Sequence, residues 1–428
     1  MAYSNVIRER MTSPSITPAR AWLYLGTLIV GYIGVYLCRK NFSVAVPLLQ
    51  ADLGVTKAEV GVVASVSTLA YAVGKFFFGP VIDRFGGRIC FLLSLVGVAI
   101  FGGLGGMVTG LAALTWLYSA NRLTGSAAWG GMVKLVPDWF TGKQLPLAMA
   151  ILSLSFVFGG ALATLFAGEI AHWSNNSWRA VMGIPSLVLL VLVVVAWFIL
   201  PKRGSLGGPA DGAASTGEKA RESSWVRIKH VLAVRQLWIV LALSFGLTMF
   251  RETFNTWTVD FIKTEGGESV STRFAAFLST PYDLVGALGI IALGWVFGRL
   301  TGKGRARLLV VILGLLAILL WNLPNFFKHG LWLVTASVGL IGFLSYGPYS
   351  LLAGILAVEI RGPAYVATVA GFVDGIGYVA SILAGRQFGQ IVDFGGYRLG
   401  FQVLAGIAAA CALLSLFLYS GKEMKGPQ

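Results

Sequence analysis

The amino-acid sequence predicts an all-α membrane protein with twelve transmembrane helices in two halves of six. Of its 428 residues, 56% are hydrophobic and 12% are charged, and the mean hydropathy is +0.78. Soluble domains carry about 25% charged residues. The apolar residues form runs of roughly 18 to 25, long enough for a helix to cross a bilayer, without the two-residue period of barrel strands. These features exclude a soluble enzyme and a DNA-binding protein.

Windows of about 20 apolar residues place the helices in order along the chain. The first six are expected at 21–47, 56–82, 88–110, 112–137, 146–171 and 178–200. The second six are expected at 236–262, 272–298, 307–325, 331–356, 364–392 and 397–420. The segment between them is charged and rich in Gly, Ala and Ser, a composition typical of a flexible linker. We therefore expect two six-helix bundles, residues 1–200 and 236–428, joined by a cytoplasmic linker at 201–235.

The 33 lysines and arginines are distributed unevenly between the two sides of these helices. Twenty lie on the side of both chain ends, six lie in the opposite loops and seven lie inside helices. The positive-inside rule then places both ends and the linker in the cytoplasm. Because the net charge of +15 is spread over many loops, no nucleic-acid partner is expected. The three cysteines stand far apart in apolar runs, so no disulfide, metal or cofactor is expected.

The two halves repeat each other. The string "GPVIDRFGGR" from Gly79 is echoed 215 residues later by "GWVFGRLTGKGR" from Gly294, and both strings follow the second helix of their half. A second pair, "SWRAVMG" and "GYRLGFQ", is offset by 219 residues. Transporters built from such repeats bind their substrate between the halves near mid-membrane.

The first Gly-rich string resembles the signature loop between helices two and three of the major facilitator superfamily, and the resemblance implies that fold. Its matching residues are Gly79, Asp83, Arg84, Gly86, Gly87 and Arg88. An acid here can accept from a helix N-terminus or an arginine, while the glycines allow a tight turn. We predict that Asp83, Arg84 and Arg88 gate the cytoplasmic side. The echo has Gly298 in place of the acid, so its contact should be weaker.

Charged residues inside the helices point to an anionic substrate. Each interior cation costs roughly 2.5–3.5 kcal/mol at mid-helix, which calls for a counter-charge. The interior cations are Arg39, Lys40, Lys75, Arg122, Lys134, Arg251 and Arg386; the interior acids are Glu252, Asp283, Asp374 and, at a helix end, Glu359. The excess of positive charge predicts a cavity for an anion.

Two arginines are candidates for binding that anion. Tyr32, Tyr36 and Arg39 follow an i, i+4, i+7 spacing and therefore share a helix face. Alternatively, Arg39 and Lys40 are snorkelling ends of a shorter helix. Arg251 follows Arg39 by 212 residues, close to the repeat offset, so the two arginines are plausible symmetry mates. Two facing guanidiniums suit a phosphate dianion better than a single carboxylate.

Nearly the whole chain resembles the organophosphate:phosphate antiporters, which include bacterial glycerol-3-phosphate and hexose-6-phosphate transporters. The strings that carry the resemblance are "YLCRKNFSVAVP", "LAYAVGKFFFGPVIDR", "MFRETFNTW" and "GFLSYGPYSL". The resemblance implies that Arg39 and Arg251 hold the phosphate. It also implies a substrate cavity that includes Tyr32, Tyr36, Tyr71, Lys75, Asp283 in helix eight and Tyr346 in the helix-ten string.

Departures from the family bear on the substrate. Ser155 stands where glycerol-3-phosphate carriers have a histidine, and Ala128 to Gly131 replace a Gly-Trp-Pro-Pro string. Arg122 and Asp374 stand where small or neutral residues are expected. They are either a structural ion pair, the interpretation we favour here, or extra contacts to a substrate that bears an amine or a second acid.

These observations predict a secondary transporter that exchanges a phosphorylated organic anion for inorganic phosphate by rocker-switch alternating access. We expect a monomer in the lipid bilayer of a bacterial inner membrane. One alternative is a proton-coupled organic-anion symporter that uses Asp283 or Asp374 as the proton carrier. The other is a transporter-like receptor for a phosphorylated metabolite. No motif that activates a nucleophile is present, so an enzyme is not expected.

Overall fold

The computed structural model describes residues 17–140, 144–201, 229–352, 356, 360 and 366–419. Over these residues the secondary structure is helical, without strands, which confirms the predicted all-α class. The first group of helices is α2 (Pro18–Leu53), α3 (Lys57–Phe85), α4 (Gly87–Gly105), α5 (Leu111–Leu135), α6 (Gln144–Trp173) and α7 (Trp178–Ile199). The second group is α9 (Arg235–Glu265), α10 (Thr272–Ser279), α11 (Pro281–Arg299), α12 (Gly302–Asn322), α13 (Leu331–Leu351), α15 (Val366–Leu383) and α16 (Arg386–Ser415). Most of the expected linker, residues 202–228, and Glu359 lie outside the described residues.

Ten helical stretches in the described chain are long and apolar enough to cross a membrane. One of them, Val369–Ser415, contains two expected helices, because the backbone leaves helical geometry at Gly395 and Gly396. Helix α5 is not among the ten, since its buried polar residues lower its hydropathy. The ten stretches, one of which contains two expected helices, and α5 together account for the twelve expected spans.

The helix boundaries differ from the expected ones at two instructive places. The eighth span, expected to be continuous over 272–298, is broken between α10 and α11, because Pro281 has no N–H to continue the hydrogen-bond ladder. Helix α2 extends to Leu53, well beyond the expected residue 47, and ends at Gly54, whose positive φ of 65° favours glycine. The hydropathy window stopped early because the last turns of α2 carry Gln50 and Asp52.

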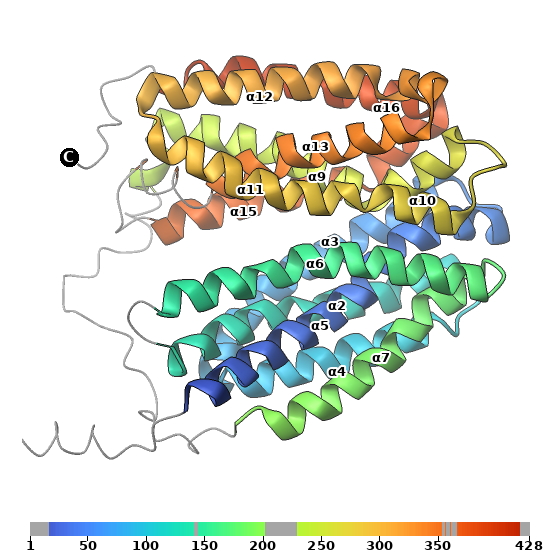
Figure 1. The fold of residues 1–428 in the computed structure, drawn as a ribbon, viewed down its shortest axis with the longest axis vertical. Coiled ribbons are helices and arrows are strands. Elements are labelled where there is room, and N and C mark those ends of the chain that lie inside the picture. Colours follow the sequence, from blue (N-terminus) through green and yellow to red (C-terminus); the bar gives the residue numbers. More distant parts are fainter. Residues whose placement is uncertain are drawn as a thin grey trace, which may run out of the picture.

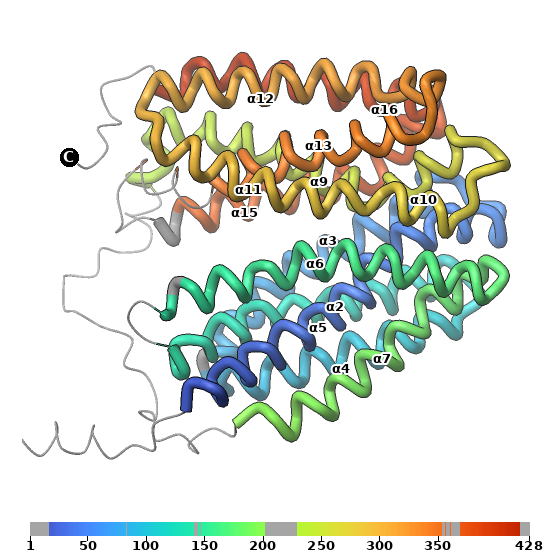
Figure 2. The backbone as a smooth tube through the Cα atoms, in the orientation of Figure 1, coloured from blue at the N-terminus to red at the C-terminus, as the bar shows by residue number. Residues whose placement is uncertain are grey.

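The helices form two bundles. In Figure 1 the bundle of α2–α7 is drawn below and the bundle of α9–α16 above. Figure 2 shows the described chain starting and ending on the left of both bundles. The bundles meet where α2 ends and α3 begins: α2 packs on α9, α3 on α15 and α16, and α6 on α10 and α11. We call this the far end, because it is opposite the two chain ends.

Glycines allow the bundles to touch through their backbones at the far end. A Cβ atom built on Gly61 of α3 would lie 2.6 Å from the carbonyl oxygen of Gly385. One built on Gly389 would lie 2.5 Å from the carbonyl oxygen of Lys57. Such approaches exclude any side chain, as is common where helices pack closely in membranes.

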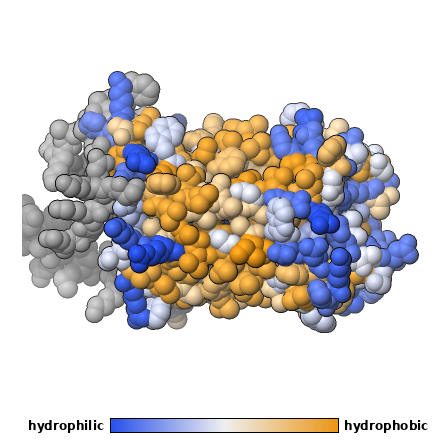
Figure 3. Space-filling model, turned by 90° about the horizontal axis from the view of Figure 1, so that it is seen from above, coloured by the Kyte–Doolittle hydropathy of each residue, from blue (hydrophilic) through white to orange (hydrophobic). Residues whose placement is uncertain are grey.

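The outer surface has the distribution of a membrane protein. The face drawn in Figure 3 has a hydrophobic middle band with hydrophilic residues toward both ends. Large apolar side chains such as Phe76, Phe198 and Trp116 are more than two-thirds exposed. Because a soluble monomer rarely exposes such an extended apolar surface, this band is the lipid-facing surface of an integral membrane protein.

Candidate substrate-binding site

A cavity of about 520 Å³ lies between the two bundles. This volume is within the range of small-molecule sites. Its walls come from α2, α3, α5 and α6 on one side and from α9, α11, α13 and α15 on the other. The structure brings together in this cavity all ten residues predicted to contact substrate: Tyr32, Tyr36, Arg39, Tyr71, Lys75, Arg122, Arg251, Asp283, Tyr346 and Asp374.

The string Arg39-Lys40-Asn41 divides its side chains between the cavity and the bundle interior. Arg39 and Lys40 line the cavity. Asn41 is fully buried and donates from Nδ2 to the backbone oxygen of Val181 on α7, at 3.0 Å. Tyr118 of α5 donates to the backbone oxygen of Arg39, at 2.7 Å. The two cations are therefore held at the middle of a long helix, and the snorkelling interpretation is wrong.

Three cations of the first bundle surround one tyrosine ring. The centroid of the Tyr71 ring lies 4.7 Å from Cζ of Arg122, 5.2 Å from Cζ of Arg39 and 5.7 Å from Nζ of Lys75. The negative face of an aromatic ring attracts cations but does not neutralise them. Within the described residues, none of these three side chains forms an ion pair.

The second bundle contributes one arginine, and some of its hydrogen-bond donors are already used within the protein. Arg251 of α9 donates from Nη2 and Nε to Oε1 of Glu252, at 2.8 Å and 3.1 Å. Its Cζ lies 4.2 Å from the ring centroid of Tyr349. Both flanking groups hold the guanidinium against the cavity wall, where part of its donor fork remains available to a ligand.

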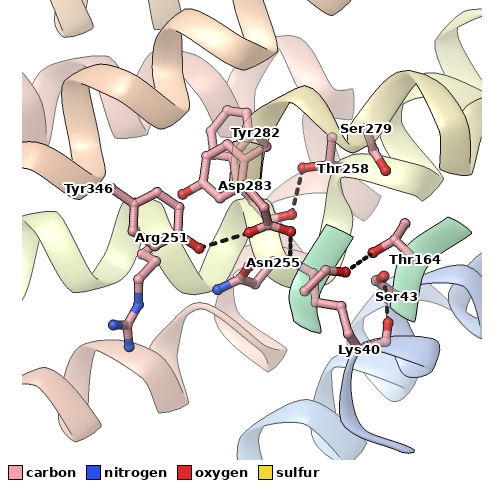
Figure 4. A network of polar contacts seen from close by, with 12 residues as sticks. Lys40, Ser43, Thr164, Arg251, Asn255, Thr258, Ser279, Tyr282, Asp283 and Tyr346 are labelled. Atoms are coloured by element: carbon pink, nitrogen blue, oxygen red, sulfur yellow. Dashed lines mark hydrogen bonds and ion pairs between the residues drawn. The ribbon is translucent and has the colours of Figure 1, made fainter. Parts of the chain in front are cut away.

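An ion pair crosses the cavity between the bundles. Nζ of Lys40 lies 3.0 Å from Oδ2 of Asp283, and both side chains are largely buried. Lys40 also donates to Asn255, and Tyr346 donates to Oδ1 of Asp283 at 2.9 Å. Figure 4 shows Lys40 reaching this group from α2, while the guanidinium of Arg251 points away from it. Asp283 is thus already engaged by Lys40 and Tyr346 in this conformation.

The predicted ion pair between Arg122 and Asp374 is not formed. Both residues line the cavity, and no salt bridge joins them in the described part of the chain. Arg122 belongs to α5 of the first bundle and lies on Tyr71, whereas Asp374 belongs to α15 of the second bundle. Because the cavity separates these walls, the favoured structural pairing is wrong for this conformation.

Comparison with known proteins identifies the family. A family model described as the Major Facilitator Superfamily matches residues 28–385. The chain belongs to this superfamily. The chain also resembles a structure titled as a bacterial homolog of the human lysosomal transporter Spinster, with a TM-score of 0.79 and 16% identity, over 96% of this chain and all of that one. This likeness confirms the fold.

Several curated relatives are named as organophosphate transporters, as the family resemblance implied. A probable hexose phosphate transport protein of Chlamydia pneumoniae is 26% identical over 93% of this chain and 90% of its own. The glycerol-3-phosphate transporter of Bacillus subtilis is 26% identical, over 93% and 91%. The membrane sensor protein UhpC of Escherichia coli is 27% identical, over 93% and 92%. These three relatives are named as membrane transport or membrane sensor proteins, not as enzymes, and the fold is that of a transporter.

In this superfamily member, the signature loop forms the predicted tight turn between α3 and α4. Gly86 has a φ of 88°, which favours glycine. Arg88 donates to the backbone oxygens of Trp197 and Leu200 at the end of α7, at 2.8 Å and 3.0 Å. Arg84 lies 5.5 Å from the Phe85 ring centroid. The side chain of Asp83 lies outside the described residues, so the gating role of this loop stays a prediction.

A polar network at the far end of this superfamily fold was missed by the sequence interpretation. Asp260 of α9 is 1% exposed and accepts from Lys57, from Tyr397 and, at 2.8 Å, from Gln50. We call these four residues the far-end network. Lys57 is one of the six cations that the hydropathy pattern places in loops opposite the chain ends, and Asp260 was not predicted, although an acid in the apolar run "TWTVDFI" is itself a signal.

A second carboxylate of the second bundle also joins the two bundles at the far end. Asp393 of α16 accepts from the backbone N–H groups of Lys57 and Ala58, at 3.0 Å and 2.7 Å. These donors are at the start of α3, where helix N–H groups lack partners and the helix dipole favours negative charge. The two bundles are therefore joined at the far end by charged groups as well as by glycine contacts.

Proposed function

We propose that this protein exchanges a phosphorylated organic anion for inorganic phosphate by rocker-switch alternating access. The observation that carries the proposal is the placement of Arg39 and Arg251, from matching positions of the two halves, in one cavity with excess positive charge. Two guanidinium forks can bind a phosphoryl group bidentately from opposite walls. The names of the hexose phosphate and glycerol-3-phosphate relatives support the same substrate class.

Charge balance supports a dianion. Lys40 is paired with Asp283, and Arg251 with Glu252. Among the described residues that line the cavity, this leaves three unpaired cations, Arg39, Lys75 and Arg122, against the single acid Asp374. The excess of two charges matches a phosphate dianion, or an organic phosphate of the same charge.

Obligate exchange follows from the cost of burying charge. To reorient empty, the protein must occlude unpaired guanidiniums away from water, which costs several kcal/mol per ion. A bound dianion offsets that charge and lowers the barrier to closure. Inorganic phosphate leaving down its gradient then drives uptake of the organic phosphate.

The membrane orientation belongs to the proposal as well. If the positive-inside bias holds, both chain ends face the cytoplasm and the closed far end faces the other side. The structure then represents an inward-facing conformation of a monomer in a bacterial inner membrane. In this arrangement Asp83, Arg84 and Arg88 act on the cytoplasmic side, where the bundles must close in the opposite conformation.

Counterflow in proteoliposomes tests the proposal. Vesicles preloaded with unlabelled phosphate should take up labelled phosphate, and empty vesicles should not. Arg39→Lys keeps the charge but loses the forked donors of the guanidinium. The exchange rate should therefore fall at least about tenfold, which corresponds to the loss of one charge-assisted hydrogen bond. The matched control is Arg179→Lys, since Arg179 pairs with Asp52 at the half-exposed surface. Absence of phosphate exchange in the wild type, or an active Arg39→Lys variant, would refute the clamp.

A sensor is the second candidate, because one relative of similar identity is named as a membrane sensor protein. Such a protein would bind the same ligand in the same cavity without moving it. Calorimetric titration with organic phosphates next to the flux assay separates the two functions. Binding without flux identifies a sensor, whereas uptake that needs only an inward proton gradient identifies the proton-coupled symporter.

A further inference from the structure

We infer that the cavity has a second subsite, made by Arg122, Lys75 and Asp374, for the end of the substrate that does not carry the phosphoryl group. The subsite takes a carboxylate together with an ammonium group, so the organic substrate is a phosphorylated amino acid. The inference rests on the proposed function, because it takes the phosphoryl group as bound between Arg39 and Arg251.

Arg122 forms no ion pair with any residue that the structure describes. Its side chain lines the cavity yet is only 6% exposed, and Nε has no hydrogen-bond partner. A side pocket of about 10 Å³ next to it holds at most about one water. The same guanidinium also lines the main cavity, where the polar end of a ligand can reach it. A carboxylate suits it, since its two oxygens match the planar fork.

The phosphoryl site does not account for Arg122. Arg39 and Arg122 lie on the same Tyr71 ring, with Lys75 at its edge. Like charges this close repel one another unless an anion lies between or beside them. A phosphoryl group held by Arg39 and Arg251 engages one guanidinium of this cluster and leaves Arg122 and Lys75 for a second anionic group. Neutral hydroxyl groups of a sugar would leave this charge in place.

Asp374 completes the subsite from the opposite bundle. It is an exposed residue of the cavity wall, with no ion pair or side-chain hydrogen bond within the described chain. A phosphoryl dianion with a carboxylate carries three negative charges and would exceed the excess of two in the cavity. An ammonium group facing Asp374 restores the balance. A phosphorylated amino acid therefore has the same net charge as the phosphate for which it is exchanged.

Competition for labelled phosphate exchange tests the subsite with four probes that differ in two charges. Glycerol-3-phosphate has neither group, phosphoglycerate has the carboxylate, phosphoethanolamine has the ammonium, and phosphoserine has both. In the wild type, phosphoserine should inhibit best. Each missing group should weaken inhibition by roughly 10- to 100-fold, as expected for a charged hydrogen bond. The inhibition constant of each probe is divided by that of unlabelled phosphate, so that the contribution of the phosphoryl group, which all probes share, cancels.

Two variants assign the charges to residues. Phosphoserine and phosphoethanolamine differ in the carboxylate, so Arg122→Gln should make them inhibit equally well. Phosphoserine and phosphoglycerate differ in the ammonium group, so Asp374→Asn should make those two inhibit equally well. The readout is the ratio of inhibition constants within each variant, which a general loss of transport does not change. Arg179→Gln, a similar charge removal outside the cavity, should leave both ratios unchanged.

The outcomes separate this inference from the proposed function. If the wild type exchanges phosphate but glycerol-3-phosphate or a hexose phosphate competes as well as phosphoserine, the subsite is refuted while the antiport proposal stands. If phosphoglycerate equals phosphoserine, the ammonium assignment fails. If phosphate itself does not exchange, the proposed function fails first. Should either variant be inactive, the wild-type comparison alone still decides the substrate class.

Discussion

Removal of the Asp260 charge should open the far end of the protein. Asp260→Asn keeps the size of the side chain but breaks the ion pair with Lys57. Loss of one partner in a buried pair costs about 3–5 kcal/mol. Lys57 is 14% exposed against 2% for Asp260, so the unpaired lysine can regain some water, and we take the lower limit of about 3 kcal/mol.

This cost affects only one conformation. Within the far-end network, the contacts of Lys57 and Gln50 with Asp260 join the two bundles, so these contacts exist only while the far ends are together. A change of about 3 kcal/mol shifts the equilibrium between closed and open far ends by roughly 100-fold. If about 1% of wild-type molecules have an open far end, about half of the variant molecules should have one.

Distances between spin labels on the two bundles measure this shift in lipid nanodiscs. Ala112→Cys and Glu268→Cys add labels at exposed far-end positions on opposite bundles, while the native cysteines are buried. The matched control is Asp52→Asn, because Asp52 accepts from Trp178 and Arg179 within the first bundle. Identical distance distributions for wild type and Asp260→Asn would refute the reasoning.

Three further predictions concern packing and charge. Gly61→Val should prevent closure of the far end against Gly385 and reduce phosphate exchange at least tenfold, with normal binding; full exchange would contradict the 2.6 Å approach. Gly86→Val should lower stability by about 1–3 kcal/mol because of the positive φ, seen as a lower melting temperature in detergent; an unchanged value would show that the turn relaxes. Lys40→Met and Asp283→Leu should each lower the free energy of unfolding more than the double variant does, because each leaves one buried charge without its partner. A double-mutant cycle should therefore give a coupling of at least about 1 kcal/mol, and strict additivity would exclude the ion pair.

Much of the architecture could be predicted from local sequence alone. The membrane spans follow from hydropathy, because each helix satisfies its own backbone in lipid and needs no distant partner to be recognised. The turn at Gly86 follows from a local backbone requirement. The helix-face spacing of Tyr32, Tyr36 and Arg39, the repeat offset of Arg251 and the family resemblance predicted a shared site. The structure places these residues around one cavity, and their contact with substrate stays a prediction.

Partner choice among charged residues depended on the tertiary structure. The sequence shows that Lys40, Arg122, Asp283 and Asp374 are costly inside a membrane, but not which of them meet. The folded chain joins Lys40 to Asp283 and leaves Arg122 apart from Asp374, because those contacts depend on how helices from different bundles are placed across the cavity.

The sequence by itself thus determined the membrane location, the fold class, the duplication and the positive cavity, which all depend on local composition or on regular spacing. The tertiary structure alone decided the far-end network of Asp260 and the unpaired state of Arg122. Ion pairs and close glycine contacts are set by distances of a few ångströms between helices far apart in the chain. Such distances are fixed only when the two bundles pack together.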